Sequence, residues 1–190
     1  MGMNRKYSGF TLVEMLIVMG IIIILMAVGI AAGRFAIQRA NDVAHQNAAD
    51  QLFTAVQSYL TDEREYPTLD GLTNGWTDAL SEGGILGEYL SIGEFRGGTD
   101  STYYYWTDGR SALVCVSLGG FDDVDARGYY CTGNGFGATG APGITEKDVD
   151  NLGAGLEAWP ANTSGWLFKQ NWDNGDATTD PGFEAVVAGS

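Results

Sequence analysis

The stretch "SGFTLVEMLIVMGIIIILMAVGI", Ser8 to Ile30, decides the architecture of this chain because it is long and apolar enough to cross a membrane. The apolar run covers the 24 residues 10–33 and contains one charged side chain, Glu14. As a helix it would extend about 36 Å, so it could cross a hydrocarbon core of about 30 Å with some tilt. Arg5 and Lys6 precede the run, which predicts a cytoplasmic N-terminus and an exported remainder.

Three interpretations of this segment compete. A secretory signal peptide would be cleaved near residues 27–29 or 31–33, but its apolar region is usually only about 7–15 residues long. A plain signal anchor would let Glu14 reach the lipid headgroups. In the third interpretation Glu14 is a functional acid, because a charge within a membrane span costs on the order of 3 kcal/mol and usually has a partner. The length of the run and the glutamate within it argue against the signal peptide.

The residues "SGFTLVE", 8–14, resemble the class III signal of type IV pilins and pseudopilins. The shared pattern is a short basic leader ending in glycine, then phenylalanine, then glutamate four residues later, then an apolar helix. The resemblance covers about the first 60 residues. It implies that a membrane aspartyl peptidase, the prepilin peptidase, cuts between Gly9 and Phe10 and methylates the new amine of Phe10. It also implies that Glu14 pairs with the Phe10 amine of a neighbouring subunit.

Such pairing would explain the acid in physical terms. Before assembly Glu14 is expected to be an isolated charge or to be protonated. In a filament an opposite charge would lie beside it, and the pair would fix the axial register between subunits. Register is the expected role because desolvation can cancel the attraction within a buried pair.

The helix is expected to continue beyond the membrane through residues 34–62, where the pattern becomes amphipathic. Five apolar side chains recur at helical spacing on one face: Leu52, Phe53, Val56, Tyr59 and Leu60. Pilins often carry a proline in the membrane half, where the helix loosens in the filament, but this chain has Ala31 at that position. Any local opening is therefore expected at residues 29–33, which contain two glycines.

Residues 63–190 are expected to form a globular head with a small antiparallel sheet that packs on the helix, an α+β fold. Strands are predicted at residues 102–107, 112–118 and 128–132, and weaker candidates lie at 166–168 and 183–187. The loop that begins at "YPT", residues 66–68, resembles the start of the variable loop in pilins and major pseudopilins. Short helical turns are predicted at residues 76–80 and 86–90, and the C-terminal region is rich in glycine and acids.

Cys115 and Cys131 lie on neighbouring predicted strands of the exported part, which favours a disulfide over two buried free thiols. Closing the short loop between them would be worth about 3 kcal/mol in the chain-entropy model. His45 is the only histidine and lies on the amphipathic half of the helix, so a zinc site is not expected.

No spacing in the chain indicates a nucleophile–base pair or a phosphate-binding loop, so no enzymatic activity is expected. Without Arg5 and Lys6 of the leader, eight basic and 24 acidic side chains leave a net charge of −16. Such a surface repels nucleic acid, and no direct nucleic-acid binding is expected.

A structural calcium ion is the one cofactor that the composition suggests. Asp173, Asp176 and Asp180 offer three carboxylates in an acidic C-terminal loop, and major pseudopilins bind calcium in such a loop. The residues 122–125 form a second, weaker candidate, because they include three aspartates. The spacing matches no defined calcium motif, so ordinary solvated loops are the default interpretation and no cofactor is expected.

The sequence thus predicts a subunit of a type IV pilus-like surface filament for adhesion or motility, or alternatively a pseudopilin of a type II secretion or DNA-uptake system. The predicted parts are a cleaved leader at 1–9, a transmembrane half-helix at 10–33, an amphipathic half at 34–62 and the head at 63–190. Expected partners are identical subunits, prepilin peptidase, the assembly machinery and the cytoplasmic membrane, which the precursor crosses once with its head outside. An unassembled membrane-anchored binding domain is a more distant third class.

Overall fold

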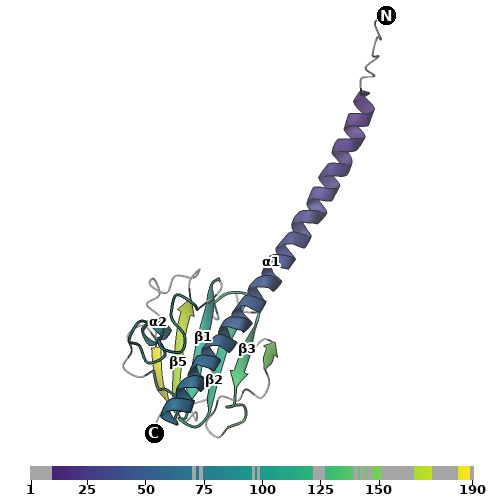
Figure 1. The fold of residues 1–190 in the computed structure, drawn as a ribbon. Helices are drawn as coiled ribbons and strands as arrows, with labels where there is room; N and C mark the ends of the chain where they lie inside the picture. The colour runs from purple at the N-terminus through teal and green to yellow at the C-terminus, as the bar shows by residue number, and fades with distance from the viewer. Residues whose placement is uncertain are drawn as a thin grey trace, which may run out of the picture. The chain divides into compact units, whose positions relative to one another are not determined.

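The computed structural model describes residues 10–69, 72, 75–95, 97, 99–121, 127–138, 141, 144, 147–150, 165–172 and 184–188. It contains a long helix, α1 (Leu12–Glu63, 52 residues), and an antiparallel sheet, which confirms the predicted α+β class (Figure 1). The chain divides into two compact units, Met1–Arg39 and Ala40–Ser190. The first contains the apolar part of α1, and the second contains the rest of α1 together with the sheet.

In the first unit, α1 exposes its apolar side chains on every side. Residues such as Leu12, Ile23 and Ile30 are each more than 60% exposed, and no residue of this unit contributes to a hydrophobic core within the described part of the chain. A helix that is apolar all round needs an apolar environment, either lipid or other helices.

In the second unit, α1 is amphipathic and packs on the sheet. Leu52 and Val56 are fully buried, while Phe53, Tyr59 and Leu60 are partly buried against the same core, as the periodicity predicts. Gln51, Thr54 and Gln57 are exposed on the other side of the helix. Figure 1 shows this half of α1 crossing in front of β1, β2 and β3.

The sheet has six strands in the order β4-β3-β2-β1-β5-β6, and all neighbouring pairs are antiparallel. The strands are β1 (Ser101–Thr107), β2 (Ala112–Leu118), β3 (Gly128–Gly133), β4 (Asp148–Asp150), β5 (Gly165–Trp172) and β6 (Glu184–Ala188). Asp108 stabilises the predicted turn between β1 and β2. Its Oδ1 atom accepts hydrogen bonds from the backbone N–H groups of Arg110 at 2.8 Å and Ser111 at 2.6 Å.

Both faces of the sheet are buried near its centre, because side chains alternate along each strand. Tyr103 and Tyr105 of β1 belong to the core that α1 covers, whereas Tyr104 and Trp106 belong to a second cluster. Ile144 is also a buried member of that second cluster, and three partly buried residues pack against the cluster: Phe136, Ala138 and Ala141. The β1 strand therefore lies at the centre of the head and is buried along its whole length.

The expected strands are all present, and β5 is much longer than predicted. The candidate at 166–168 lies in the first half of β5, which extends over eight residues, and the candidate at 183–187 overlaps β6. The β4 strand was not predicted. Of the two helical turns, the first is α2 (Trp76–Leu80), and the second is a single turn in which the Leu90 N–H donates to the Leu86 carbonyl oxygen at 3.0 Å.

Candidate functional site

The start of α1 holds the residues that the sequence singles out for processing and assembly. Phe10 is 76% exposed and directly precedes Thr11, the last residue before the helix. The Thr11 N–H and the Thr11 hydroxyl each donate a hydrogen bond to Oε2 of Glu14, both at 2.8 Å. In return, the Glu14 N–H donates to the Thr11 hydroxyl oxygen at 3.2 Å. Gly9 lies outside the described residues.

This arrangement revises the expectation that Glu14 is isolated in a single subunit. Its carboxylate already accepts two hydrogen bonds, from a residue that the sequence analysis did not single out. The signal was present in the sequence, since threonine followed three residues later by glutamate is the pattern of an N-terminal capping box. A carboxylate at this position is also favoured by the positive end of the helix dipole.

The helix that follows this site is suited to a membrane. Within the described part of the chain, α1 is the one helix that is long and apolar enough to span a bilayer. None of the residues in its most apolar stretch is buried. These features fit a membrane-anchored precursor whose acid lies at the beginning of the span.

Comparison with protein families supports the same conclusion at the level of the motif. A family model described as the prokaryotic N-terminal methylation motif matches residues 4–30. The chain carries the class III signal of type IV pilins. This motif indicates a type IV pilin-like or pseudopilin precursor, which points to a structural protein, and the signal implies processing by prepilin peptidase and assembly into a pilus-like system. No curated protein and no solved structure matches this chain.

In the head, Cys115 and Cys131 form the expected disulfide. The two residues lie directly opposite each other on β2 and β3, and both are buried in the second cluster of the sheet. The bridge therefore ties β3 to the centre of the sheet. Its position on two neighbouring strands is what the sequence predicts.

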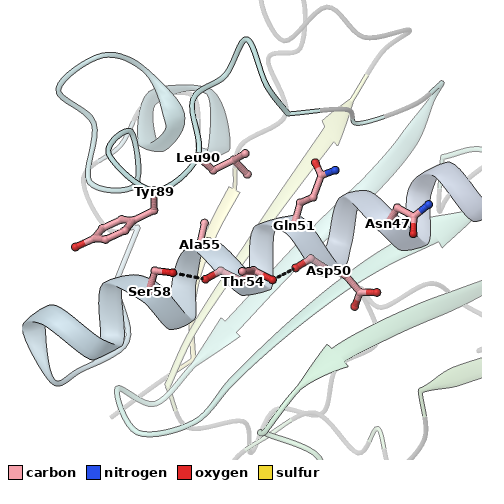
Figure 2. A pocket seen from close by; sticks show the side chains of 8 residues that line it. All are labelled: Asn47, Asp50, Gln51, Thr54, Ala55, Ser58, Tyr89 and Leu90. Carbon is pink, nitrogen blue, oxygen red and sulfur yellow. Dashed lines mark hydrogen bonds between the residues drawn. The ribbon is translucent and has the colours of Figure 1, made fainter.

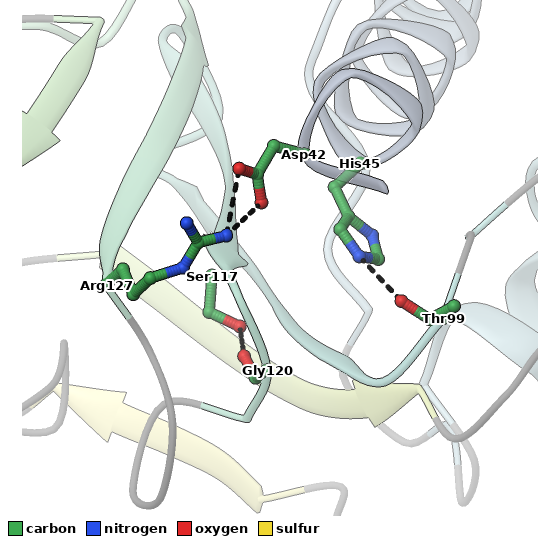
Figure 3. A network of polar contacts seen from close by, with 6 residues as sticks. All are labelled: Asp42, His45, Thr99, Ser117, Gly120 and Arg127. Atoms are coloured by element: carbon green, nitrogen blue, oxygen red, sulfur yellow. Dashed lines mark hydrogen bonds and ion pairs between the residues drawn. The ribbon is translucent and has the colours of Figure 1, made fainter. Parts of the chain in front are cut away.

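His45 is buried where α1 packs against the segment before β1. Its Nδ1 atom lies 3.0 Å from the carbonyl oxygen of Gly97, and its Nε2 atom lies 3.3 Å from the Thr99 hydroxyl (Figure 3). A carbonyl oxygen only accepts hydrogen bonds, so Nδ1 carries the proton and the Thr99 hydroxyl donates to Nε2. Burial lowers the pKa of His45, against the opposing effects of Gly97, Asp42 and Asp100. The histidine is a structural residue of the head.

Two acidic side chains on the same half of α1 form polar contacts with residues in β3 or next to it. One guanidinium nitrogen of Arg127 lies 2.9 Å from both carboxylate oxygens of Asp42 (Figure 3). Tyr130 donates to both carboxylate oxygens of Asp50 at 3.1 Å, and its own hydroxyl accepts from Lys147 at 3.2 Å. The acids of the helix thus meet basic and phenolic partners on the sheet.

An open groove of about 480 Å³ lies between α1 and the turn at residues 86–90. Figure 2 shows the residues that line it: Asn47, Asp50, Gln51, Thr54, Ala55, Ser58, Tyr89 and Leu90. The Thr54 and Ser58 hydroxyls donate to carbonyl oxygens one helical turn earlier, at 2.7 and 3.0 Å. They face no basic side chain in the groove, and the lining offers no pair of nucleophile and base.

Metal binding has no candidate among the described residues, which contain no group of three or more histidine, cysteine, aspartate or glutamate side chains that could hold an ion. The predicted calcium ligands Asp173, Asp176 and Asp180 lie outside the described residues, as do the aspartates of 122–125. Calcium binding therefore stays a prediction from the sequence.

Proposed function

We propose that this chain is the structural subunit of a type IV pilus-like surface filament, for adhesion or motility. The observation that carries the proposal is the class III signal, which continues directly into a helix whose first half is apolar on all sides. An apolar surface that leaves the lipid must be covered, and the equivalent helices of other subunits can cover it. Residues 1–9 are then the leader and residues 10–33 form the filament core.

Processing in this proposal creates the second half of the assembly contact. Hydrolysis of the peptide bond between Gly9 and Phe10 consumes one water molecule, releases the leader with a new carboxylate and leaves an amine on Phe10. In its neutral form this amine takes a methyl group from a sulfonium methyl donor, and the methylated amine is positively charged when it is protonated again. Glu14 of one subunit and the Phe10 amine of its neighbour would form a pair in an environment of low dielectric constant, where mispaired charges are costly. Apolar contacts between helices tolerate sliding, whereas this pair specifies one register.

A pseudopilin of a secretion or DNA-uptake machine is the second candidate function. The acidic C-terminal region favours it, because major pseudopilins bind calcium in such a loop. The disulfide favours the pilus, because major pseudopilins usually lack one. Long filaments on wild-type cells would support the pilus, and loss of secretion without surface filaments would support the pseudopilin.

The proposal is tested by producing Glu14→Ala as the sole subunit in the native host. Membrane insertion and cleavage should persist, because the substitution removes a charge from the span and leaves the cleavage site intact. Assembly should fail. The measurements are immunoblotting for processed subunit in membranes and electron microscopy of sheared filaments. Glu63→Ala, which removes an exposed acid from the other end of α1, is the matched control and should assemble. Normal filaments from Glu14→Ala would contradict the proposal.

A further inference from the structure

The groove between α1 and the turn at residues 86–90 is acidic. Asp50 is the one charged side chain among the described residues that line it. The Tyr89 hydroxyl donates to Oδ2 of Asp62 at 2.6 Å. That hydrogen bond is the main reason why the pKa of Tyr89 is raised to about 12, and the nearby charge of Glu88 adds to the effect. Asp62 and Glu88, which we call the acidic rim, therefore attract a cation from outside the head.

The same groove also offers apolar contact surface. Ala55 of α1 is buried in it, and Tyr89 and Leu90 are partly buried across from the helix (Figure 2). We call these three residues the apolar floor. The Thr54 and Ser58 hydroxyls beside the floor donate to carbonyl oxygens of their own helix, so an approaching apolar group leaves neither donor unpaired. The groove therefore suits an apolar side chain that lies next to a cationic one.

Such a pair of side chains lies in the first unit of the same chain, after the apolar run at 10–33. Phe35 is 65% exposed, and Arg39 is exposed as well. The two residues are four positions apart on α1 and therefore lie on one face of the helix, one turn apart. Within the described part of the chain, Phe35 joins no hydrophobic core and Arg39 forms no ion pair. Asp42, three residues after Arg39, is already paired with Arg127.

We propose that Phe35 and Arg39 of a second copy of this chain bind in the groove, the phenyl ring against the apolar floor and the guanidinium against the acidic rim. This inference rests on the proposed function, in which the α1 helices of the subunits run parallel. Arg39 follows Phe35 toward the C-terminus, as Asp62 follows Ala55, so parallel helices make both contacts in one alignment. Each subunit of a helical filament meets several neighbours at different axial shifts, and this neighbour differs from the one that pairs with Glu14.

The first test asks whether the two surfaces meet in filaments. A chain with both Arg39→Cys and Glu88→Cys is produced together with the wild-type chain in the native host, and sheared filaments are treated with a short bismaleimide. Covalent dimers should form, because residue 39 of one subunit lies beside residue 88 of another. Arg34→Cys with Glu88→Cys is the matched control, because residue 34 is also exposed but lies on another side of the helix from residue 39. A dimer yield no higher than in this control would overturn the proposal.

The second test measures filament yield per processed subunit, with each variant as the sole subunit. Arg39→Glu should lower the yield several-fold, because it places an acid against the acidic rim. Arg34→Glu, which makes the same charge change on another side of the helix, should stay near the wild-type yield. Adding Glu88→Arg to Arg39→Glu should restore much of the loss, because the two charges are then exchanged.

The outcomes separate this contact from the proposed function. Wild-type yield from Arg39→Glu, together with no filaments from Glu14→Ala, would overturn the contact and leave the proposed function standing. Less processed Arg39→Glu subunit in the membrane, with a normal yield per processed subunit, would show that Arg39 binds lipid headgroups and would also overturn the contact. Absence of filaments from the wild-type chain would overturn the proposed function, and this contact with it.

Discussion

The Nδ1 atom of His45 lies 3.0 Å from the carbonyl oxygen of Gly97, a residue 52 positions later in the chain. The same carbonyl oxygen accepts the hydroxyl of Tyr103 at 2.7 Å. Gly97 is also in contact with the indole ring of Trp172, on the last residue of β5. One backbone carbonyl therefore links α1 to β1 through hydrogen bonds, and its glycine packs against a side chain of β5.

Protonation of His45 is expected to weaken the head. Burial lowers the pKa of His45 in the folded chain, so the unfolded chain binds the proton more readily. The free energy of unfolding should therefore be at its full value above about pH 6.5, the ordinary histidine pKa, and should fall as the pH drops from there toward the folded pKa. The measurement is chemical denaturation of the full chain in detergent between pH 7.5 and pH 5.

His45→Asn is the matched variant for this prediction. The asparagine amide can take the place of the Nδ1–H donor to Gly97 and does not titrate in this range. The variant should lose the part of the pH dependence that is due to His45. An identical pH dependence in wild type and His45→Asn would show that the histidine does not contribute to it.

A side chain at Gly97 is expected to destabilise the head. A Cβ atom there would lie 2.5 and 2.6 Å from two atoms of the Trp172 indole ring and 2.9 Å from Phe95. These rings belong to one buried cluster and already pack edge to face, with centroids 4.8 Å apart. Gly97→Ala should therefore cost about 1–3 kcal/mol of unfolding free energy.

Gly93→Ala is the control for Gly97→Ala, because a Cβ atom at Gly93 meets nothing within 4 Å. Its unfolding free energy should stay within about 0.5 kcal/mol of wild type. Equal effects of the two substitutions would contradict the packing that the structure shows at Gly97.

Removal of the disulfide is expected to destabilise the head without changing its fold. The double variant Cys115→Ala, Cys131→Ala should lose about 2–4 kcal/mol, because the unfolded chain regains the freedom that the bridge removes. The pairing itself is checked by maleimide labelling of the exported chain in denaturant. Labelling should require a reductant, and complete labelling of both thiols without one would contradict the bridge.

Several elements could be predicted from the sequence because their signals are local. The apolar run, the amphipathic face around Leu52 and the aromatic strand before Asp108 each show a period that a short window reveals. The cysteines could be paired because they lie on two such strands. The capping box of Thr11 and Glu14 is equally local and was available to the same reasoning.

The remaining features depend on residues far apart in sequence. Gln170 is buried in β5, where its side-chain oxygen accepts the Trp76 N–H at 2.7 Å across 94 positions. No pattern around the polar residues 169–171 predicts a strand there, and it forms through pairing with residues 102–104 of β1. The three-residue β4 likewise exists through its pairing with β3. The contacts of His45 with Gly97 and Thr99 also join residues that are far apart in sequence.

Substitution of Gly9 is expected to block maturation. Glycine is the residue without a side chain on the leader side of the proposed cleavage site, and Phe10 follows it. Gly9→Leu should leave full-length precursor in the membrane and no filaments, because the larger side chain does not fit beside the scissile bond. Immunoblotting distinguishes the precursor from the shorter mature chain. Normal maturation of Gly9→Leu would contradict cleavage at this bond.

The central claim is that the mature chain is a filament subunit that begins at Phe10. The most direct measurement is mass spectrometry of the N-terminal peptide from filaments sheared off cells that make the wild-type chain. We expect a peptide that begins with Phe10 and carries one methyl group on its amine. A subunit that begins near Ala32, or that retains residues 1–9, would contradict it.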